Sequence, residues 1–282
     1  MANDNSAQIE EWNGRLGETW AKEQDVLDGL TRPFGEAAVG AADPRSGEQV
    51  IDIGCGCGDS SLSLARLVGE GGRVLGVDVS RPMLEVARRR GKAAGLDKLS
   101  FEEADASSAA LPGGQDLLYS RFGVMFFAAP TPAFAHLRRS LKSDGRMAFI
   151  CWRSPKDNPW ATVPVMAGRL ALGIEGPPSD PHAPGPFAFA DEGRVRGILE
   201  EAGFRNVRAE RFDSHMLLGS SPRSAAEATA RIGPLGRLVR ESGPEHLPKI
   251  LHAVEKALTP LAAKDGSVAP PAGAWVFMAK AG

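Results

Sequence analysis

A glycine-rich turn directly after a short apolar run is the feature that most constrains this chain. Residues 50–53 (Val-Ile-Asp-Ile) are followed by residues 54–58 (Gly-Cys-Gly-Cys-Gly), and a helical pattern begins at Ser60. Glycine adopts positive φ without a steric penalty and lets a ligand come close to the backbone. The N–H groups at the start of the next helix have no intrahelical partner. This order of strand, turn and helix therefore predicts a ligand at the carboxyl end of the first strand.

The spacing of the glycines separates two kinds of nucleotide site. In the pyrophosphate-binding pattern Gly-x-Gly-x-x-Gly, a third glycine follows the second after two residues. Asp59 stands at that position here, counted from Gly54 and Gly56. The pattern is instead Asp-x-Gly-x-Gly-x-Gly, from Asp52 to Gly58. This spacing disfavours a nicotinamide oxidoreductase.

Strand-like and helical patterns alternate through the first half of the chain. Apolar runs lie at 49–53, 73–77, 99–104, 115–120 and 146–152, and helical segments such as 82–94 and 131–141 lie between them. The alternation predicts βαβ units and a parallel sheet. Ser80 is expected as the N-cap of the helix 82–94, with Pro82 in its first turn. Ser143, Asp144 and Gly145 are expected to end the helix 131–141.

The composition changes after Trp152. Eight of the chain's 21 prolines lie between residues 155 and 186, which predicts an irregular insertion with one short helix near 160–172. A helix at 191–202, a strand at 204–212, a helical stretch at 221–264 and a last strand at 274–280 are expected to follow. The segment from Trp12 to Phe34 is also expected to be helical, with Trp12, Leu16 and Trp20 on one face.

Over residues 45–152 the chain resembles the class I S-adenosylmethionine-dependent methyltransferases, in particular the ubiquinone/menaquinone C-methyltransferase branch. The resemblance rests on the glycine turn, on Asp78 in Val-Asp-Val-Ser and on Asp105 in Ala-Asp-Ala. It implies that the turn packs against the methionine part of S-adenosylmethionine. It further implies that Asp78 binds both ribose hydroxyls, since a carboxylate accepts two hydrogen bonds from a diol, and that Asp105 lies beside the adenine amino group.

The residues expected at this cofactor come from the turn, from the strand ends that follow it and from the N-terminal helix. They are Trp20, Asp52, Gly54, Cys55, Gly56, Asp59, Asp78, Val79, Met83, Asp105, Ala106, Ser120, Arg121 and Phe122.

The resemblance also implies an α/β architecture: a Rossmann-like, doubly wound, seven-stranded sheet with an antiparallel last strand and helical lid insertions. The expected division is an N-terminal helical lid at 1–34, a cofactor-binding core at 35–152 and a proline-rich lid insertion at 153–190. Residues 191–282 would complete the core and carry a helical insertion at about 213–268. The N-terminal helix either covers the cofactor or only caps the sheet.

The expected function is transfer of a methyl group from S-adenosylmethionine to an O, N, C or S atom of an apolar or aromatic small molecule. Ligands of open α/β sheets bind beyond the carboxyl ends of the strands, so the pocket wall is expected from Phe122, Met125, Phe126, Phe127 and Trp152. Core packing is the favoured interpretation for Val124 and Met125, and both roles stay open for Phe126 and Trp152. The alternatives are a cyclase or a non-catalytic binding protein on the same fold, because fold does not determine function.

Catalysis is expected to rest mainly on positioning, without a metal or a covalent intermediate. Cys55 and Cys57 lie one residue apart in a tight turn and cannot by themselves complete a tetrahedral metal site. If the acceptor needs a general base, His182 and His215 are the candidates, because histidine titrates near neutral pH and both lie in segments expected to cover the site. Arg121 would hold an anionic acceptor.

The bulk properties narrow the expected partners. The formal net charge of −2 favours no nucleic-acid partner. No apolar run reaches the ~18 residues of a membrane span, and the polar N-terminus does not resemble a secretory signal. Three cysteines do not form a disulfide framework, so a cytoplasmic location is expected. The chain is expected to be a monomer or a homodimer that binds a small-molecule substrate.

Overall fold

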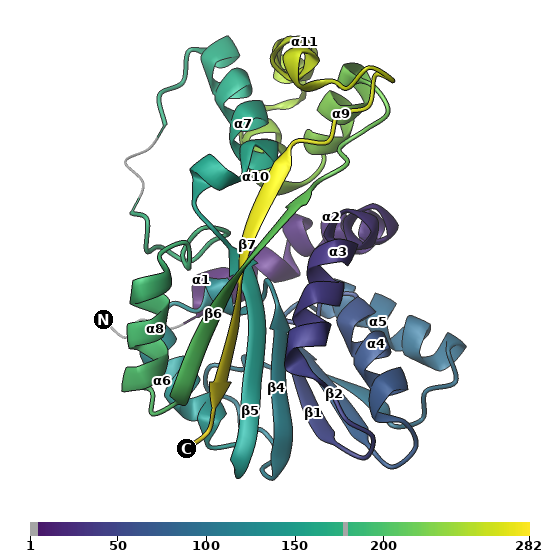
Figure 1. Ribbon diagram of the computed structural model, residues 1–282. Coiled ribbons are helices and arrows are strands. Elements are labelled where there is room, and N and C mark those ends of the chain that lie inside the picture. The colour runs from purple at the N-terminus through teal and green to yellow at the C-terminus, as the bar shows by residue number, and fades with distance from the viewer. Residues whose placement is uncertain (1–4, 177–179) are drawn as a thin grey trace.

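The computed structural model describes residues 5–176 and 180–282, which form a seven-stranded sheet in the order β3-β2-β1-β4-β5-β7-β6. Strands β1 to β5 are parallel to one another, and β7 is antiparallel to both β5 and β6 (Figure 1). The predicted doubly wound sheet with an antiparallel last strand is thus confirmed. The strands are β1 (Gln49–Ile53), β2 (Arg73–Asp78), β3 (Leu99–Glu103), β4 (Gln115–Arg121), β5 (Leu141–Trp152), β6 (Arg205–His215) and β7 (Pro271–Lys280).

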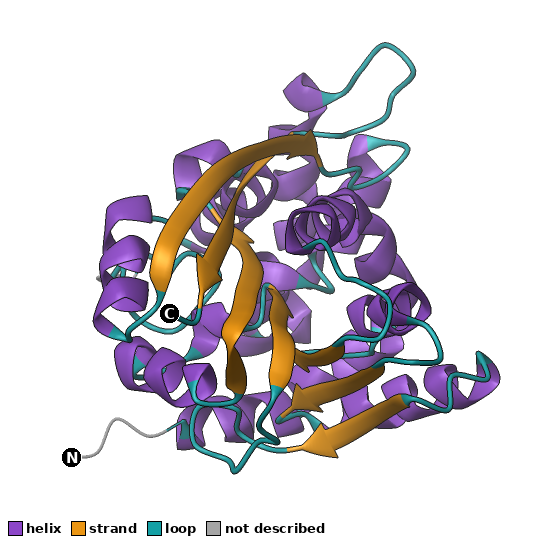
Figure 2. Cartoon of the chain, turned by 60° about the horizontal axis from the view of Figure 1, so that its bottom comes forward, coloured by secondary structure: helices purple, strands orange, loops and turns teal. Residues whose placement is uncertain are grey.

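Helices cover both faces of the twisted sheet (Figures 1 and 2). One face carries α3 (Gln24–Ala42), α4 (Asp59–Val68) and α5 (Arg81–Ala93), and the other carries α6 (Pro130–Arg138) and α8 (Glu192–Glu201). The central strands are therefore apolar on both sides, and Ile51, Leu117 and Phe149 are almost completely buried. Ser80 is the N-cap of α5 as expected, but its hydroxyl accepts no hydrogen bond from the helix and instead donates to the carbonyl oxygen of Trp12 at 2.7 Å.

The N-terminal segment is not the single helix expected at 12–34. It forms three helices, α1 (Ser6–Asn13), α2 (Arg15–Lys22) and α3, which are separated at Gly14 and Glu23. Gly14 is extended and turns the chain between α1 and α2. This turn lets the rings of Trp12 and Trp20 meet edge to face, with their centroids 5.3 Å apart.

The expected end of the helix 131–141 at Ser143–Gly145 is also wrong. Helix α6 ends at Arg138, where the N–H groups of Arg139 and Ser140 donate to carbonyl groups three residues earlier. Strand β5 then begins at Leu141, which pairs with Gln115 of β4. Residues 142–145 lie between the paired positions Leu141 and Arg146, where the register with β4 shifts, so Ser-Asp-Gly marks an irregularity inside β5 and not the end of the helix.

A second group of helices lies beyond the carboxyl end of the sheet, at the top of Figure 1. It consists of α7 (Pro159–Leu172), α9 (Pro222–Thr229), α10 (Gly233–Ser242) and α11 (Leu247–Leu258), which pack against one another and are called the helical cluster below. Short 3-10 turns complete the chain: η1 (Val124–Phe126), η2 (Pro155–Asp157), η3 (Pro244–His246) and η4 (Thr259–Leu261). The helical stretch expected at 221–264 is therefore divided, and β6 runs on to His215.

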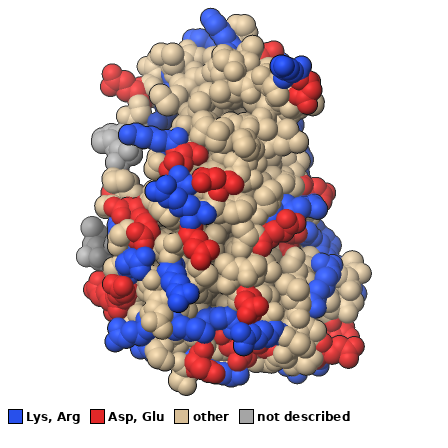
Figure 3. Space-filling model, viewed as in Figure 1, with Lys and Arg blue, Asp and Glu red and all other residues tan. Residues whose placement is uncertain are grey.

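The charged side chains are mixed on the face drawn in Figure 3, where Lys and Arg alternate with Asp and Glu over the sheet and its helices. The part of this face formed by the helical cluster carries few charges. None of the helices in the described ranges is long and apolar enough to cross a membrane.

Candidate functional site

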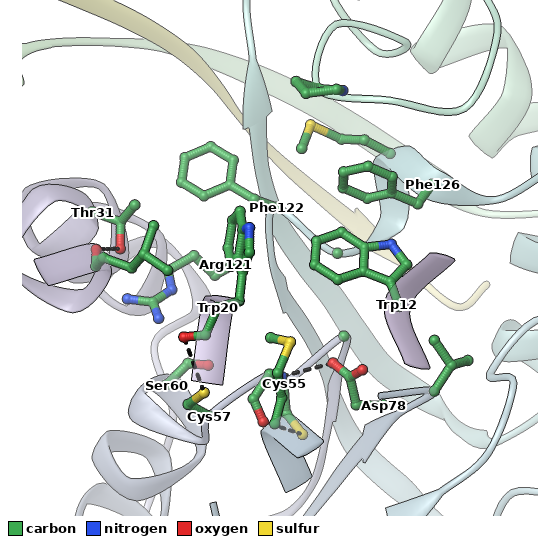
Figure 4. A pocket seen from close by; sticks show the side chains of 18 of the residues that line it. Trp12, Trp20, Thr31, Cys55, Cys57, Ser60, Asp78, Arg121, Phe122 and Phe126 are labelled. Carbon is green, nitrogen blue, oxygen red and sulfur yellow. Dashed lines mark hydrogen bonds between the residues drawn. The ribbon is translucent and has the colours of Figure 1, made fainter. Parts of the chain in front are cut away.

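A cavity lies at the carboxyl end of the sheet, where three parts of the chain meet (Figure 4). Gly54 and Asp78 line it from the ends of β1 and β2, and Trp12 and Thr31 line it from α1 and α3. Residues of the helical cluster, among them Trp160, close it from above. The site therefore combines the strand ends with segments that are far from them in sequence.

The glycine turn presents bare backbone to this cavity. Gly54 and Gly56 adopt φ values of +66° and +54°, which other residues adopt only with strain. A Cβ atom on Gly54 would lie 2.7 Å from the Cα atom of Gly123, in the loop after β4. The turn and that loop are thus in direct backbone contact, and both glycines line the cavity.

Asp78 ends β2 and carries its carboxylate into the same cavity. Its Oδ2 atom accepts a hydrogen bond from the Gly56 N–H at 2.7 Å, and its Oδ1 atom accepts one from the Ser80 N–H at 2.8 Å. Burial raises the pKa of this carboxyl above its usual range, against the effect of these backbone N–H groups. Each oxygen keeps further acceptor capacity, so the carboxylate can still bind two neighbouring hydroxyl groups.

Asp105 has a more indirect position. It does not line the cavity, although its neighbours Ala104 and Ala106 do. Its Oδ1 atom accepts from the Asn5 side-chain amide at 3.0 Å, and the Asn5 Oδ1 atom accepts from the Ala128 N–H at 3.0 Å. Asn5, which no sequence pattern singled out, therefore joins the N-terminal segment to two loops and lines the cavity itself.

The structure brings most of the predicted cofactor residues to this one cavity. Those that line it are Trp20, Gly54, Cys55, Gly56, Asp78, Val79, Met83, Ala106, Arg121 and Phe122.

Two further predicted cofactor residues support the turn from behind and do not line the cavity. Asp52 is fully buried and accepts hydrogen bonds from the hydroxyls of Ser60 and Ser61 at 2.7 and 2.6 Å, while its burial raises its pKa to about 6. Ser120 donates from its hydroxyl to the carbonyl oxygen of Ile53 at 2.7 Å. Both side chains fasten the turn to its neighbours.

The two histidines considered as general bases lie elsewhere. His182 and His215 are exposed, and neither lines the cavity.

The Cys57 thiol lines the cavity, and its burial raises its pKa to about 12. It stays protonated at neutral pH and packs as a small apolar group.

Aromatic side chains form the upper wall. Phe122 adopts a φ of +59°, which is unusual for a bulky residue, and its ring stacks on Trp152 with the centroids 4.0 Å apart. Trp160 lies 4.9 Å from Trp152, and its Nε1–H donates to the Asn158 side chain at 2.8 Å. Phe126 meets Trp12 edge to face at 5.3 Å. Phe122, Phe126 and Trp152 all line the cavity, whereas Val124 is buried away from it.

Two buried polar atoms at the cavity have no hydrogen-bond partner among the described residues. Apart from Asp28 Oδ2, which forms an ion pair with Arg90, they are Trp20 Nε1, a donor from α2, and Gln8 Oε1, an acceptor from α1. A buried polar group without a partner costs about 1–3 kcal/mol. One free donor and one free acceptor therefore point to a ligand that carries the complementary groups.

An ionic network borders the cavity below Phe122. Arg121 at the end of β4 lies 2.9 Å from Asp59 Oδ2 and 3.5 Å from Asp28 Oδ1. Arg90 of α5 lies 2.9 Å from Asp28 Oδ2 and 3.4 Å from Asp59 Oδ1. Arg121 and Asp28 line the cavity, whereas Asp59, expected at the cofactor, does not. Asp28 had no sequence signal, because its role depends on how α3 packs.

Comparison with known proteins identifies one recognised domain. Residues 50–145 match the family described as a methyltransferase domain. The match contains the glycine turn, Asp78, Asp105 and Phe122, and it excludes α1 to α3 and the helical cluster.

Three similar proteins extend this finding. The chain is 29% identical over 185 residues to nocamycin O-methyltransferase of Saccharothrix syringae, which covers 63% of this chain and 66% of that protein. It is 33% identical over 136 residues to the ubiquinone/menaquinone biosynthesis C-methyltransferase UbiE of Azotobacter vinelandii, covering 47% and 54%. It is 30% identical over 117 residues to the uncharacterized methyltransferase YcgJ of Bacillus subtilis, covering 41% and 45%.

The YcgJ crystal structure superposes on 87% of this chain and 97% of that one, with a TM-score of 0.58 and 16% identity, which shows a shared fold. By sequence, the chain spans between one third and two thirds of the length of the first curated relatives it matches.

Proposed function

We propose that this chain, whose residues 50–145 form a methyltransferase domain on the class I fold, transfers a methyl group from S-adenosylmethionine to an apolar or aromatic small molecule. One observation carries the proposal. The glycine turn and Asp78 form one wall of a cavity whose other wall is aromatic. A polar, nucleotide-type ligand can therefore bind against the first wall while an apolar acceptor binds beside it against the second.

The residues of the first wall fit the cofactor in their chemistry. The backbone at Gly54 and Gly56 leaves room for a close ligand, and the Asp78 carboxylate suits a ribose diol. The free Trp20 Nε1–H suits a carboxylate, and the free Gln8 Oε1 suits an amino group. S-adenosylmethionine carries all of these groups, and it supplies a methyl group bound to a positively charged sulfur.

The residues of the second wall would position the acceptor and exclude water. Alignment of two reactants removes much of the entropic part of a barrier, and a dry site protects the reaction from water. Phe122 and Trp152 form a stacked aromatic surface beside the turn, and Trp160 extends it. Such surfaces line most small-molecule pockets. We therefore infer an acceptor with an aromatic or extended apolar body.

The experiment that tests this function uses S-adenosylmethionine labelled in its methyl group and a panel of aromatic and extended apolar compounds that carry hydroxyl, amino, thiol or acidic C–H groups. The expected result is a labelled product and S-adenosylhomocysteine in equal amounts, measured by mass spectrometry. A cyclase or a binding protein would yield no S-adenosylhomocysteine. Efficient labelling of RNA, DNA or intact protein instead would contradict the small-molecule acceptor.

The N-terminal helices are proposed to act as a lid over the cofactor. Asn5, Gln8, Trp12 and Trp20 line the cavity from α1, α2 and the residue before them. Binding of S-adenosylhomocysteine is therefore expected to slow amide hydrogen exchange in residues 5–34, because the ligand would fill the space below them. Hydrogen-exchange mass spectrometry with and without the ligand measures this, with α8 as the internal reference. If exchange were equal with and without S-adenosylhomocysteine, these helices would act only as a structural cap of the sheet.

A further inference from the structure

We propose that Asp28 accepts the proton of a hydroxyl group on the acceptor, and that Arg121 holds the oxygen anion that results. This inference rests on the proposed function and narrows it to O-methylation of a compound with an acidic hydroxyl, such as a phenol or an enol. Asp28 would then be a catalytic residue contributed by α3, outside the matched domain.

The geometry places both groups at the cavity and away from bulk water. The side chains of Asp28 and Arg121 are 14% and 13% exposed, and both line the cavity. Figure 4 shows the Arg121 side chain beside that of Phe122, at the foot of the aromatic wall. An aromatic acceptor packed against Phe122 and Trp152 can therefore bring a ring hydroxyl to the Asp28–Arg121 pair.

The charges of the network explain why the proton would go to Asp28. The network contains two carboxylates, Asp28 and Asp59, and two guanidinium groups, Arg90 and Arg121, so its formal charge is zero. A bare oxygen anion would add an unbalanced charge to a buried site, which is costly. A proton moved from the acceptor to Asp28 leaves the sum unchanged and releases Arg121 from one of its two carboxylate partners.

Groups from four elements face Asp28 and decide its basicity. They are Arg121 from β4, Arg90 from α5, Asp59 from α4 and the protonated thiol of Cys57 from the glycine turn. Burial, followed by the negative charge of Asp59, raises the pKa of Asp28 above its usual range, while the two guanidinium groups oppose this. A carboxylate with a raised pKa is a better general base near neutral pH.

The bonds and charges of the step balance. The acceptor oxygen forms a bond to the methyl carbon of S-adenosylmethionine. The bond between that carbon and sulfur breaks, and its electron pair stays on sulfur, which becomes a neutral thioether. The hydroxyl proton ends on an Asp28 oxygen and leaves to water after the product is released.

The test compares Asp28→Asn with Asp59→Asn. Both variants remove one negative charge from the same network, but only the first removes the proton acceptor. With the hydroxylated acceptor found in the panel, Asp28→Asn is expected to lower kcat by about 100- to 10,000-fold, the usual contribution of a general base. It should also replace the acid limb of the wild-type pH profile, where activity falls as Asp28 becomes protonated, with a limb set by ionisation of the acceptor hydroxyl. Asp28→Glu should keep the limb set by its carboxylate, and Asp59→Asn should keep it but move it to lower pH, because the charge of Asp59 raises the pKa of Asp28.

A second measurement needs no knowledge of the natural acceptor. The protein is loaded with S-adenosylhomocysteine, and 4-nitrophenol is added at a pH below the pKa of the free phenol. Absorbance spectroscopy shows whether the bound probe is ionised. Calorimetry in two buffers with different ionisation enthalpies gives the number of protons released to the buffer. In the wild type, the bound probe should show the phenolate absorbance without releasing a proton to the buffer. In Asp28→Asn, the phenolate should form with release of about one proton.

The outcomes separate this inference from the proposed function. Retained affinity for S-adenosylhomocysteine shows that each variant is folded. The role of Asp28 would be overturned if Asp28→Asn and Asp59→Asn lowered kcat equally. It would also be overturned if the wild type bound 4-nitrophenol only as the neutral phenol, or not at all. Wild-type transfer to carbon, nitrogen or sulfur acceptors alone would overturn O-methylation and leave the methyltransferase function standing. Absence of S-adenosylhomocysteine formation with every acceptor would instead reject the proposed function.

Discussion

Replacing Asp78 with alanine is expected to raise the Kd for S-adenosylmethionine by about 10- to 150-fold. The estimate corresponds to the roughly 1.5–3 kcal/mol that a hydrogen bond to a charged group contributes. The carboxylate lies at the cavity beside the glycine turn, where it would bind the ribose hydroxyls. Isothermal titration calorimetry measures the change directly.

The control for this variant is Glu103→Gln. Glu103 pairs with Asp78 in the register of β2 and β3, but it forms an exposed ion pair with Arg81 and does not line the cavity. Its substitution removes the same charge from the neighbouring strand end and should leave the affinity nearly unchanged. If the wild type and Asp78→Ala bound S-adenosylmethionine with equal affinity, the assignment of Asp78 to the cofactor would be wrong.

Replacing Gly54 with alanine is expected to lower the free energy of unfolding by about 2–5 kcal/mol. A left-handed conformation costs a non-glycine residue about 1–2 kcal/mol, and overpacking costs about 1–3 kcal/mol more. The second cost applies because the new Cβ would lie 2.7 Å from the Cα atom of Gly123, which is backbone and cannot rotate away. Chemical denaturation followed by circular dichroism measures the loss.

Gly95→Ala isolates the effect of the surroundings. Gly95 has a φ of +65°, almost the same as the +66° of Gly54, but a Cβ there would meet nothing within 4 Å. Only the conformational cost of about 1–2 kcal/mol is expected at this position. If both variants lost the same stability, the contact between the glycine turn and the loop after β4 would be shown to be loose.

The sheet and the position of the glycine turn and Asp78 at its edge were predictable because their signals are local. Each signal lies within one short segment of the chain: the strand before Gly54, the strand that ends at Asp78 and the apolar run before Arg121. The parallel sheet then carries these strand ends to one edge, as its topology requires. The same reasoning was wrong at Ser143–Gly145, which lie at a register shift inside β5 and do not end the preceding helix.

The rest of the site depends on packing between distant segments. Asn5, Gln8 and Asp28 carry no motif, and they reach the cavity only because the N-terminal chain bends at Gly14 and Glu23. The bend brings Gly17 so close to its neighbours that a Cβ there would lie 2.0 Å from the carbonyl oxygen of Trp12. No periodicity in the sequence predicts such an approach.

For the two histidines, the sequence suggested a role at the site, but the structure places them away from the cavity. His182 and His215 were chosen because imidazole titrates near neutral pH and because their segments were expected to cover the site. The structure exposes both side chains, whereas the buried carboxyl group of Asp28 lies at the cavity. Titration in free solution is a weak guide to catalytic groups, because burial and neighbouring charges decide which group is basic.

The cavity is lined partly by the matched domain and partly by segments outside it. Gly54, Gly56 and Asp78 lie inside residues 50–145, whereas Thr31, Trp160 and Pro234 line the cavity from outside that range. If the proposed function holds, drift or recombination in the outer segments can alter the choice of acceptor while the glycine turn and Asp78 stay unchanged. We therefore expect orthologues to differ in acceptor mainly through these segments, and exchange of them between relatives offers a route to new specificity on one unchanged sheet.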